Sequence, residues 1–564
     1  MSPRAGAPLR VGLLMDSMEQ PGWVRVLLNE IIGSDFASVE LIILNQGQGD
    51  IRPPPKNLWD RLRRYWAVRD KLLYVAHQRM ERMNFKPSPD ALGSKDISVL
   101  LEGVPVLSVT PRETRFSDYL SDEAVEAIQG HDLDLMIRLG FRILRGGVLT
   151  AARHGVWSYH HGDNRVNRGG PFGFWEVLLN WPETGYLVQV LNEDLDGGQV
   201  LRRGSVRTHP LSHHLSRDGL LWRSSRALPQ CMRELHRLGA DAFFPKHDEF
   251  GGVPPFYSQR LFRNPTNREM LGPLIRHAGR YVKRKFRSLT SYEQWQLRYG
   301  HGTGPAASMW RLKALEPPAD RFWADPCVVP AEDGHWVFFE EYLYGPARGR
   351  ISALRIDADG VVGEPQVVLD LSYHLSYPFV FEYEGTHYMI PESASNGTVD
   401  LYRCDELPGP WIHDRVLLEG VWADATVFEH GGRWWMFATD QPHPSTSLSE
   451  ELHLFHADSP LSTEWIPHKN NPVVSDVTRA RPAGRVMRLG DRLVRPAQDC
   501  SVSYGYGIHF REILHLSDEC YSEKDVGRLL PDWDPSVVGI HTYSNHGGLT
   551  VVDARVRRRG WNRG

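Results

Sequence analysis

A change of hydrophobic pattern near Met309 constrains the fold of this chain more than any other feature of its sequence. Before it, short apolar runs such as RVGLLMDS and VELIILN alternate with segments of helical spacing. After it, helical periodicity nearly disappears, and aromatic and β-branched runs alternate with Gly, Asp and Asn turns. Strands alternating with helices indicate a parallel sheet, whereas many short strands indicate an all-β domain. We therefore expect a multidomain protein.

The same pattern predicts the domain limits. Residues 1–240 are expected to form an α/β domain with a Rossmann-like, mainly parallel sheet, and residues 241–308 a connector that contains a helix. In residues 309–556, modules of roughly fifty residues recur, each with a turn such as EYEGTHY, EHGGRWW or RLGDRL. This spacing favours an all-β five-bladed β-propeller over a sandwich.

Composition narrows the function classes. A formal net charge of −4 disfavours nucleic acid as a partner. The five cysteines are scattered without a CxxC motif, which is typical of a reducing cytoplasm rather than of a disulfide framework. The first residues lack a signal-peptide pattern, and no run of about 18 apolar residues occurs, so we expect a cytoplasmic protein without a membrane partner.

A polar cluster follows a predicted strand in the stretch Asp132–Arg202. The strand ends at His160-His161, an NRGGP turn follows, and an acidic glycine-rich loop returns at residues 195–198. Open α/β sheets build their sites from such loops at strand ends. The stretch is therefore a candidate active site.

The same stretch resembles the formyltransferase family, which includes methionyl-tRNA formyltransferase and the sugar N-formyltransferases. The matching elements, in order, are GFRIL (residues 140–144), SYH (158–160), NRGGP (167–171) and LDGG (195–198). The resemblance implies a formyl or related one-carbon transfer from 10-formyltetrahydrofolate to an amine of a sugar or small metabolite. It implies catalytic roles for His160 as base, Asp196 as its orienter, and Ser158 and Asn164 as polar stabilisers. It also implies a cofactor site at Phe141, Ile143, Leu144 and Asp194.

The residue chemistry agrees with this reading. An amine that attacks a formyl carbonyl sheds a proton while the carbonyl oxygen gains charge, and a histidine oriented by a carboxylate serves both needs. Ser158 stands where the family has an amide, and HGDNR replaces a Ser-Leu-Leu-Pro loop. Adjacent histidines on a strand end point to opposite faces, so neither His160-His161 nor His213-His214 predicts a metal ion.

Carboxylates recur in the predicted propeller beside aromatic residues. We select Asp325, Glu392 and Asp424, with Trp323 and Trp422 two positions before two of them, as sugar-binding or catalytic candidates. Carboxylates across a sugar act as acid and base in glycoside chemistry, and aromatic rings stack on sugars. FWADP, YPFVFEYEGTHYMIPES and RPAGR resemble arabinanase-like glycoside hydrolases and, more closely, the propeller-like domain of glucosamine inositolphosphorylceramide transferases.

These observations lead to one main expectation and two alternatives. The main expectation is a formyltransferase whose propeller binds a glycan or a glycosylated acceptor. In the first alternative the propeller is a glycoside hydrolase or glycosyltransferase and the N-terminal domain is a degenerate scaffold. In the second, both domains only bind ligands, the propeller being a carbohydrate-binding module.

Overall fold

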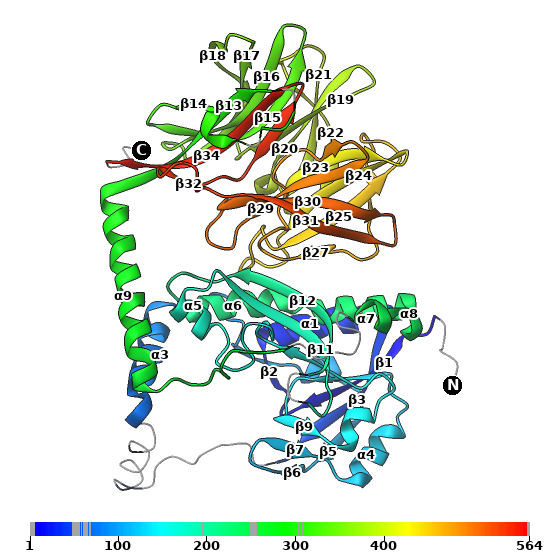
Figure 1. The fold of residues 1–564 in the computed structure, drawn as a ribbon. Helices are drawn as coiled ribbons and strands as arrows, with labels where there is room; N and C mark the ends of the chain where they lie inside the picture. Colours follow the sequence, from blue (N-terminus) through cyan, green and yellow to red (C-terminus); the bar gives the residue numbers. More distant parts are fainter. Residues whose placement is uncertain are drawn as a thin grey trace. The chain divides into compact units, whose positions relative to one another are not determined.

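A computed structural model describes residues 6–47, 57, 59, 66, 69–194, 197–248, 256–302, 304–306 and 308–560. The chain divides into two compact units, Met1–Gly279 and Arg280–Gly564. Figure 1 shows an α/β unit built from the N-terminal half and an all-β unit built from the C-terminal half. The multidomain class expected from the change in hydrophobic pattern is therefore confirmed.

A seven-stranded sheet forms the centre of the first unit, with the order β12-β11-β10-β8-β1-β3-β5. Its strands are β1 (Leu9–Met15), β3 (Ala37–Asn45), β5 (Val106–Val109), β8 (Leu135–Arg138), β10 (Val156–His160), β11 (Glu183–Val190) and β12 (Gln199–Arg207). The five strands from β10 to β5 pair in parallel, and β11 and β12 continue the sheet antiparallel. The apolar runs that predicted buried strands thus occupy the middle of a mainly parallel sheet.

Apolar side chains of the sheet are covered on both faces. Consecutive strand residues point to opposite faces, and Leu13 and Leu14 accordingly belong to two separate cores. Helices of this unit are α1 (Gly22–Ile32), α3 (Leu72–Asn84), α4 (Asp122–Gln129), α5 (Phe174–Leu179), α6 (His213–Ser224), α7 (Ala227–Leu238) and α8 (Ala240–Lys246). Two small sheets join β2 (Glu19–Pro21) to β4 (Ser94–Asp96), and β6 (Arg112–Glu113) to β7 (Ser117–Tyr119) and β9 (Ile143–Arg145).

The described part of the second unit forms five sheets, all antiparallel. Three follow one another along the chain: β15 (Arg321–Ala331) to β18 (Val361–Leu369), β19 (Ser376–Tyr383) to β22 (Ile412–Glu419), and β23 (Trp422–His430) to β27 (Val474–Ser475). Their inner members are β16 (Gly334–Leu343), β17 (Arg348–Ile356), β20 (Thr386–Glu392), β21 (Thr398–Cys404), β24 (Arg433–Asp440), β25 (Glu451–Ala457) and β26 (Ile466–Pro467). The fourth runs through β28 (Met487–Leu489), β29 (Arg492–Asp499), β30 (Gly507–Leu516) and β31 (Tyr521–Leu529).

The fifth sheet combines strands from the two ends of the unit. β13 (Ser291–His301) pairs along its whole length with β34 (Leu549–Arg559), so that Leu297 lies opposite Asp553. β14 (Lys313–Leu315) pairs with β13, while β32 (Val537–Gly539) and β33 (Tyr543–His546) pair with β34. Backbone hydrogen bonds within one sheet therefore join β13, near the start of the unit, to β34, near its end.

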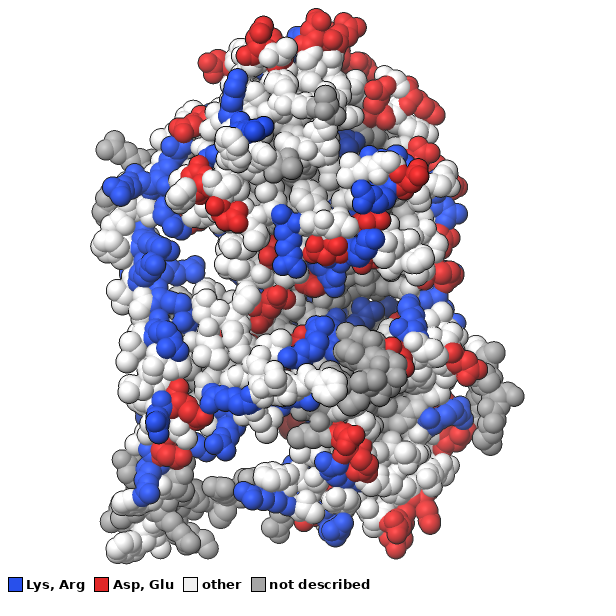
Figure 2. Space-filling model, viewed as in Figure 1, with Lys and Arg blue, Asp and Glu red and all other residues white. Residues whose placement is uncertain are grey.

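The observed boundary differs from the expected connector at residues 241–308. That segment contains α9 (Asn267–Thr290) and β13, and β13 belongs to the second unit because it pairs with β34. Figure 2 shows Lys and Arg side chains along α9, whereas both charge signs are mixed over most of the remaining visible surface. Among the described helices, none is long and apolar enough to cross a membrane.

Candidate functional site

The first strands of three sheets share one irregularity. Each has a break in strand register, at Ala324/Cys327 in β15, Ser376/Phe379 in β19 and Ala423/Thr426 in β23. Within each break one residue has a left-handed backbone: Asp325 (φ 53°), Tyr377 (φ 41°) and Asp424 (φ 54°). Residues other than glycine rarely adopt this conformation, and such strain concentrates at functional sites. The repeated bulge thus places two carboxylates and a phenol at equivalent positions.

The two remaining sheets complete this centre. Arg481 lies beside an isolated bridge between Pro482 and Ala497 of β29, and its side chain reaches Asp424. His541 and Thr542 come directly before β33, and both contact Asp325. All five sheets therefore contribute a polar side chain to one buried cluster. We call Asp325, Tyr377, Asp424, Arg481, His541 and Thr542 the central cluster.

Asp325 is held on both carboxylate oxygens. Its Oδ1 accepts a hydrogen bond from Thr542 Oγ1 at 2.8 Å, and its Oδ2 accepts one from the Tyr377 backbone N–H at 3.3 Å. Burial raises the pKa of the Asp325 carboxyl, although the nearby His541 opposes this rise. The side chain is consequently oriented and poised to exchange a proton.

His541 bridges two carboxylates. Its Nε2 lies 3.3 Å from Asp325 Oδ1, and its Nδ1 lies 2.6 Å from Asp553 Oδ2. Burial lowers the pKa of this imidazole, but the charges of Asp553 and Asp325 outweigh burial and raise it. Trp295 stacks on the ring with 4.0 Å between centroids, which fixes the ring plane. A carboxylate behind a histidine stabilises its protonated form.

Asp424 has a different partner. Arg481 donates from Nε to Oδ2 at 2.6 Å and from the second guanidinium nitrogen to Oδ1 at 3.1 Å, and Gln498 Nε2 donates to Oδ2 at 3.1 Å. Burial raises the pKa of Asp424 to about 6, while Arg481 restrains the rise. The fork-like geometry of this pair is the strong form of an arginine–carboxylate contact.

Neighbouring strands add further carboxyl groups. Glu340, Glu392 and Thr439 occupy equivalent positions, opposite Ala324, Ser376 and Ala423. Glu340 is buried, and burial, followed by the charges of Asp325 and Glu392, raises its pKa well above the usual range. Glu392 accepts hydrogen bonds from Ser376 Oγ at 2.7 Å and from the Ala394 N–H at 2.9 Å. Glu340 is thus a carboxylic acid among carboxylates, the arrangement that separates acid from base in many sites.

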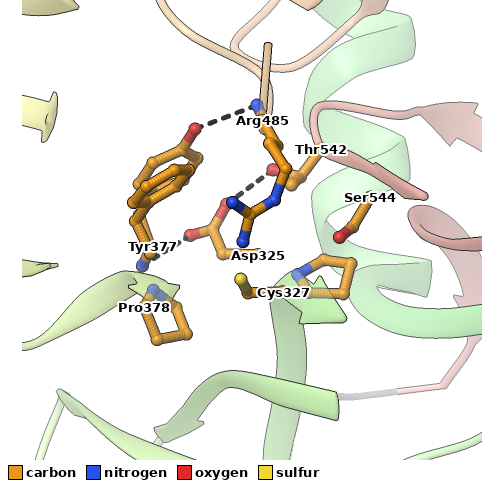
Figure 3. Close-up of a pocket in the computed structure, with 10 residues that line it drawn as sticks. Asp325, Cys327, Tyr377, Pro378, Arg485, Thr542 and Ser544 are labelled. Carbon is orange, nitrogen blue, oxygen red and sulfur yellow. Dashed lines mark hydrogen bonds between the residues drawn. The ribbon is translucent and has the colours of Figure 1, made fainter. Parts of the chain in front are cut away.

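A small pocket opens beside Asp325. Cys327, Arg485 and Ser544 line it together with Asp325, Tyr377 and Thr542. Figure 3 shows the Asp325 carboxylate between the Tyr377 backbone and the Thr542 hydroxyl, with the Arg485 side chain beside it. The Tyr377 hydroxyl accepts a hydrogen bond from the Gly484 N–H at 2.9 Å, which holds the phenol in the pocket wall.

Of the residues selected from the sequence in this unit, the carboxylates lie in the central cluster or act on it, and the tryptophans pack against other aromatic side chains. Asp325 and Asp424 belong to the central cluster, and the charge of Glu392 acts on Asp424. Trp422 packs against His453 and Phe455.

Trp323 packs against Phe339, and its Nε1 lies 3.5 Å from Glu341 Oε1. Sequence reasoning did not assign Arg481, His541 or Asp553 to the site, because no spacing links them to Asp325, although the RPAGR motif begins at Arg481.

The polar candidates of the N-terminal unit lie around the end of β10. Ser158 is buried, and its hydroxyl accepts a hydrogen bond from Arg138 Nε at 3.0 Å. His160 Nε2 lies 3.4 Å from the Asn167 carbonyl oxygen. Asn164 Oδ1 accepts a hydrogen bond from Arg203 at 2.8 Å, while its amide nitrogen is buried without a partner in the described structure.

The expected cofactor residues lie on neighbouring loops. Phe141 has a left-handed backbone (φ 62°), and its N–H donates to Asp16 Oδ1 at 2.9 Å. Ile143 and Leu144 belong to β9, and the Asp194 N–H donates to Asn192 Oδ1 at 3.0 Å. Asp196, the expected partner of His160, lies outside the described residues.

Comparison with known proteins identifies a family match in the second unit. A family model described as "Glucosamine inositolphosphorylceramide transferase 1, N-terminal" matches residues 312–533. Proteins named glucosamine inositolphosphorylceramide transferase 1 from Oryza sativa subsp. japonica and Arabidopsis thaliana are each 36% identical over 208 residues, or 36% of this chain. The matched stretch covers 28% and 27% of those proteins, so the chain spans less than a third of their length.

Solved structures show only weak similarity. A family 117 glycoside hydrolase from Zobellia galactanivorans has a TM-score of 0.31 at 11% identity, covering 48% of this chain and 91% of its own. Glycinamide ribonucleotide transformylase 1 from Symbiobacterium toebii has a TM-score of 0.26 at 16% identity, covering 41% and 88%.

These comparisons correct the function expected from the sequence. The matching family model, which covers residues 312–533 of the all-β unit, and both curated relatives are named as glucosamine inositolphosphorylceramide transferases. The prediction of a formyltransferase using a folate donor is therefore wrong. The expectation failed because it inferred the reaction from short motifs in the α/β unit. A function has to be argued from the geometry and chemistry of a complete site. Similarity to the glucosamine inositolphosphorylceramide transferases, noted in residues 310–545, is confirmed.

Proposed function

We propose that the C-terminal unit is a five-bladed β-propeller that binds a sugar at its central cluster and transfers the glycosyl group. Five antiparallel sheets with bulged first strands support the propeller, as does the sheet that joins β13 to β34. A propeller directs the first strand of each blade toward a common axis. Equivalent positions in separate sheets then meet, which accounts for the contacts of Asp325 with His541 and of Asp424 with Arg481.

One observation carries the assignment of chemistry. The central cluster and the neighbouring Glu340 provide carboxyl groups whose pKa values are raised to different extents, that of Glu340 well above its usual range and that of Asp424 to about 6. Transfer at a glycosidic carbon needs one carboxylic acid that can donate a proton and one carboxylate that can accept a proton. Buried carboxyl groups in distinct environments fulfil this requirement near neutral pH.

The geometry suggests a role for each group. Asp325 takes the proton of the acceptor hydroxyl as that oxygen bonds to the glycosidic carbon. Glu340 gives its proton to the departing oxygen as the glycosidic bond breaks. His541 holds the Asp325 carboxylate from the side opposite Tyr377, and Arg481 keeps Asp424 ionised beside them. Protons and bonds balance without a further reactant.

The names of the relatives suggest the class of acceptor. Both proteins are named glucosamine inositolphosphorylceramide transferase 1, a name that includes a sugar-bearing lipid. We accordingly propose a sugar or glycolipid acceptor for this chain. The hydroxyl of water in place of a sugar hydroxyl would turn the same site into a hydrolase.

The assignment can be tested with aryl glycosides of glucosamine, N-acetylglucosamine and common pentoses, with and without inositol as acceptor. We expect Asp325→Asn to lower turnover by about 10²–10⁴-fold, the usual contribution of a general base. Glu340→Gln should cost as much with a nitrophenyl leaving group but little with a dinitrophenyl group, which departs without protonation. Products containing inositol identify transfer, whereas free sugar alone identifies hydrolysis.

Arg479→Met is a matched control, because Arg479 is two residues from Arg481 but forms a partly exposed ion pair with Asp476. Its turnover should equal that of the unmodified chain. Unchanged turnover in both Asp325→Asn and Glu340→Gln, or no turnover and no binding of any sugar in the panel, contradicts the proposal.

A further inference from the structure

Buried nitrogen and oxygen atoms gather between two helices of the N-terminal unit. His77 and Glu81 stand one turn apart on α3, and His213 is the first residue of α6. One side-chain ligand atom from each lies within 4.8 Å of those of the other two. The three side chains are 5%, 1% and 2% exposed as whole residues, so water does not compensate these atoms.

Several of these polar atoms have no partner. Within the described residues, neither ring nitrogen of His77 forms a hydrogen bond, and Glu81 Oε1 forms none either. His77 Nε2 lies 4.0 Å from that carboxylate oxygen, too far for a hydrogen bond. An unsatisfied buried polar atom costs about 1–3 kcal/mol, so three in one cluster indicate a missing component.

A hydrogen bond to Gln78 fixes the tautomer of His213. His213 Nε2 lies 3.0 Å from Gln78 Oε1, an oxygen that can only accept, so Nε2 carries the proton. The other nitrogen, Nδ1, then presents a lone pair to Glu81 Oε2 at 3.3 Å. Two lone pairs face each other at this contact, and only a cation or a proton between them makes it favourable.

Neighbouring side chains hold His213 and Glu81 in place. Gln78 orients His213, and Ser212 Oγ donates to Glu81 Oε2 at 2.7 Å. Metal-bound histidines and carboxylates are held by such outer hydrogen bonds.

We propose that His77, Glu81 and His213 bind one divalent transition-metal ion, with Zn²⁺ as the best-matched ion. Two imidazoles and one carboxylate are an established ligand set for Zn²⁺ at about 2.0–2.2 Å. Binding draws the three side chains together and ties α3 to α6. The ring of His277 on α9, with its centroid 6.2 Å from that of His77, is placed to approach as a fourth ligand.

The sequence alone argued against a metal here, because His213 and His214 are adjacent. The structure shows a different combination, in which only His213 of that pair joins His77 and Glu81 from another helix. The proposed ion does not take part in the glycosyl transfer proposed for the other unit, and the two proposals fail or succeed separately.

The first test is metal analysis of the purified full chain by inductively coupled plasma mass spectrometry. After chelation, the chain is titrated with Zn²⁺ by calorimetry and with Co²⁺ by visible spectroscopy. We expect one ion per chain and the d–d bands of Co²⁺ bound by nitrogen and oxygen ligands. Glu81→Gln and His77→Ala should each abolish the stoichiometric site, and Gln78→Leu should weaken binding by about 10–100-fold.

His413→Ala is the control, since His413 is half exposed and belongs to the other unit. It should bind the metal as the unmodified chain does. Glu81→Gln preserves side-chain shape, so circular dichroism can verify that a loss of binding is not a loss of folding. A chain that binds neither Zn²⁺ nor Co²⁺, or a Glu81→Gln variant that binds as tightly as the unmodified chain, overturns the proposal.

Discussion

Replacing Arg481 by methionine tests the electrostatics of the central cluster directly. Arg481 forms two hydrogen bonds to Asp424, and both side chains are buried, 10% and 2% exposed. Methionine retains much of the arginine stem but leaves the carboxylate without its cation. Removal of one partner of a buried ion pair costs about 3–5 kcal/mol. We expect Arg481→Met to lower the free energy of unfolding of Arg280–Gly564 by this amount at pH 8.

The loss of stability caused by Arg481→Met should increase as the pH rises. The pKa of Asp424 is about 6 in the folded chain against an ordinary value of 3.8. A group whose pKa is higher in the folded state loses stabilising free energy as the pH rises from the unfolded value to the folded value. In the unmodified chain this loss is complete near pH 6. Without Arg481 the folded pKa is higher still, so the loss continues above pH 6.

The size of this effect follows from linkage. For each unit by which Arg481→Met raises the pKa of Asp424 in the folded chain, the free energy of unfolding at high pH falls by about 1.4 kcal/mol. From pH 6 to pH 8 we therefore expect Arg481→Met to lose about 2–3 kcal/mol more than the unmodified chain. Urea unfolding at pH 6, 7 and 8, with pulse proteolysis to identify the transition of the C-terminal unit, measures this difference.

Two comparisons complete the experiment. Arg479→Met removes a partly exposed ion pair, which is worth about 0–1 kcal/mol, and should show no added pH dependence. Adding Asp424→Asn to Arg481→Met removes the titrating group and should abolish the slope between pH 6 and 8. If Arg481→Met has the same slope as the unmodified chain, Asp424 is not the buried, arginine-dependent carboxylate described above.

Three further predictions concern other parts of the chain. Gly169→Ala should destabilise the N-terminal unit by about 1–3 kcal/mol in urea unfolding, because a Cβ there would lie 1.8 Å from the Phe262 carbonyl oxygen. Gly170→Ala, where a Cβ meets nothing within 4 Å, is the control, and equal effects would contradict the reasoning. All five cysteines are free but only Cys520 is exposed, so a thiol reagent should modify one residue rapidly in the native chain; a second fast thiol would be inconsistent with the fold. Glycosyl transfer should decline as rising pH deprotonates Glu340, whose pKa burial raises well above its usual range, and rates measured with a dinitrophenyl glycoside should not show this decline.

The local sequence pattern was sufficient to predict an α/β unit followed by an all-β unit. Continuous apolar runs such as LRVGLLM predicted buried parallel strands, and this run forms β1 at the centre of the sheet. Alternating aromatic and β-branched residues predicted the antiparallel sheets after Met309. Asp325 and Asp424 were selected from the sequence because carboxylates recur beside aromatic residues, and their role in the site stays a prediction.

The sequence did not reveal which strands far apart in the chain pair with one another. β13 lay inside the expected connector, since its place in a sheet depends on β34 at the other end of the unit. The bulges at Asp325, Tyr377 and Asp424 were not foreseen, and a one-residue change of register reverses the face of every later side chain.

The same reasoning separates what the sequence determined from what tertiary structure decided. Hydrophobic period is a property of consecutive residues, so the sequence alone determined a parallel α/β unit followed by antiparallel sheets. A site is a property of distances between residues remote in the chain. Tertiary structure therefore decided that Arg481 neutralises Asp424, that His541 joins Asp325 to Asp553, and that His77 meets His213.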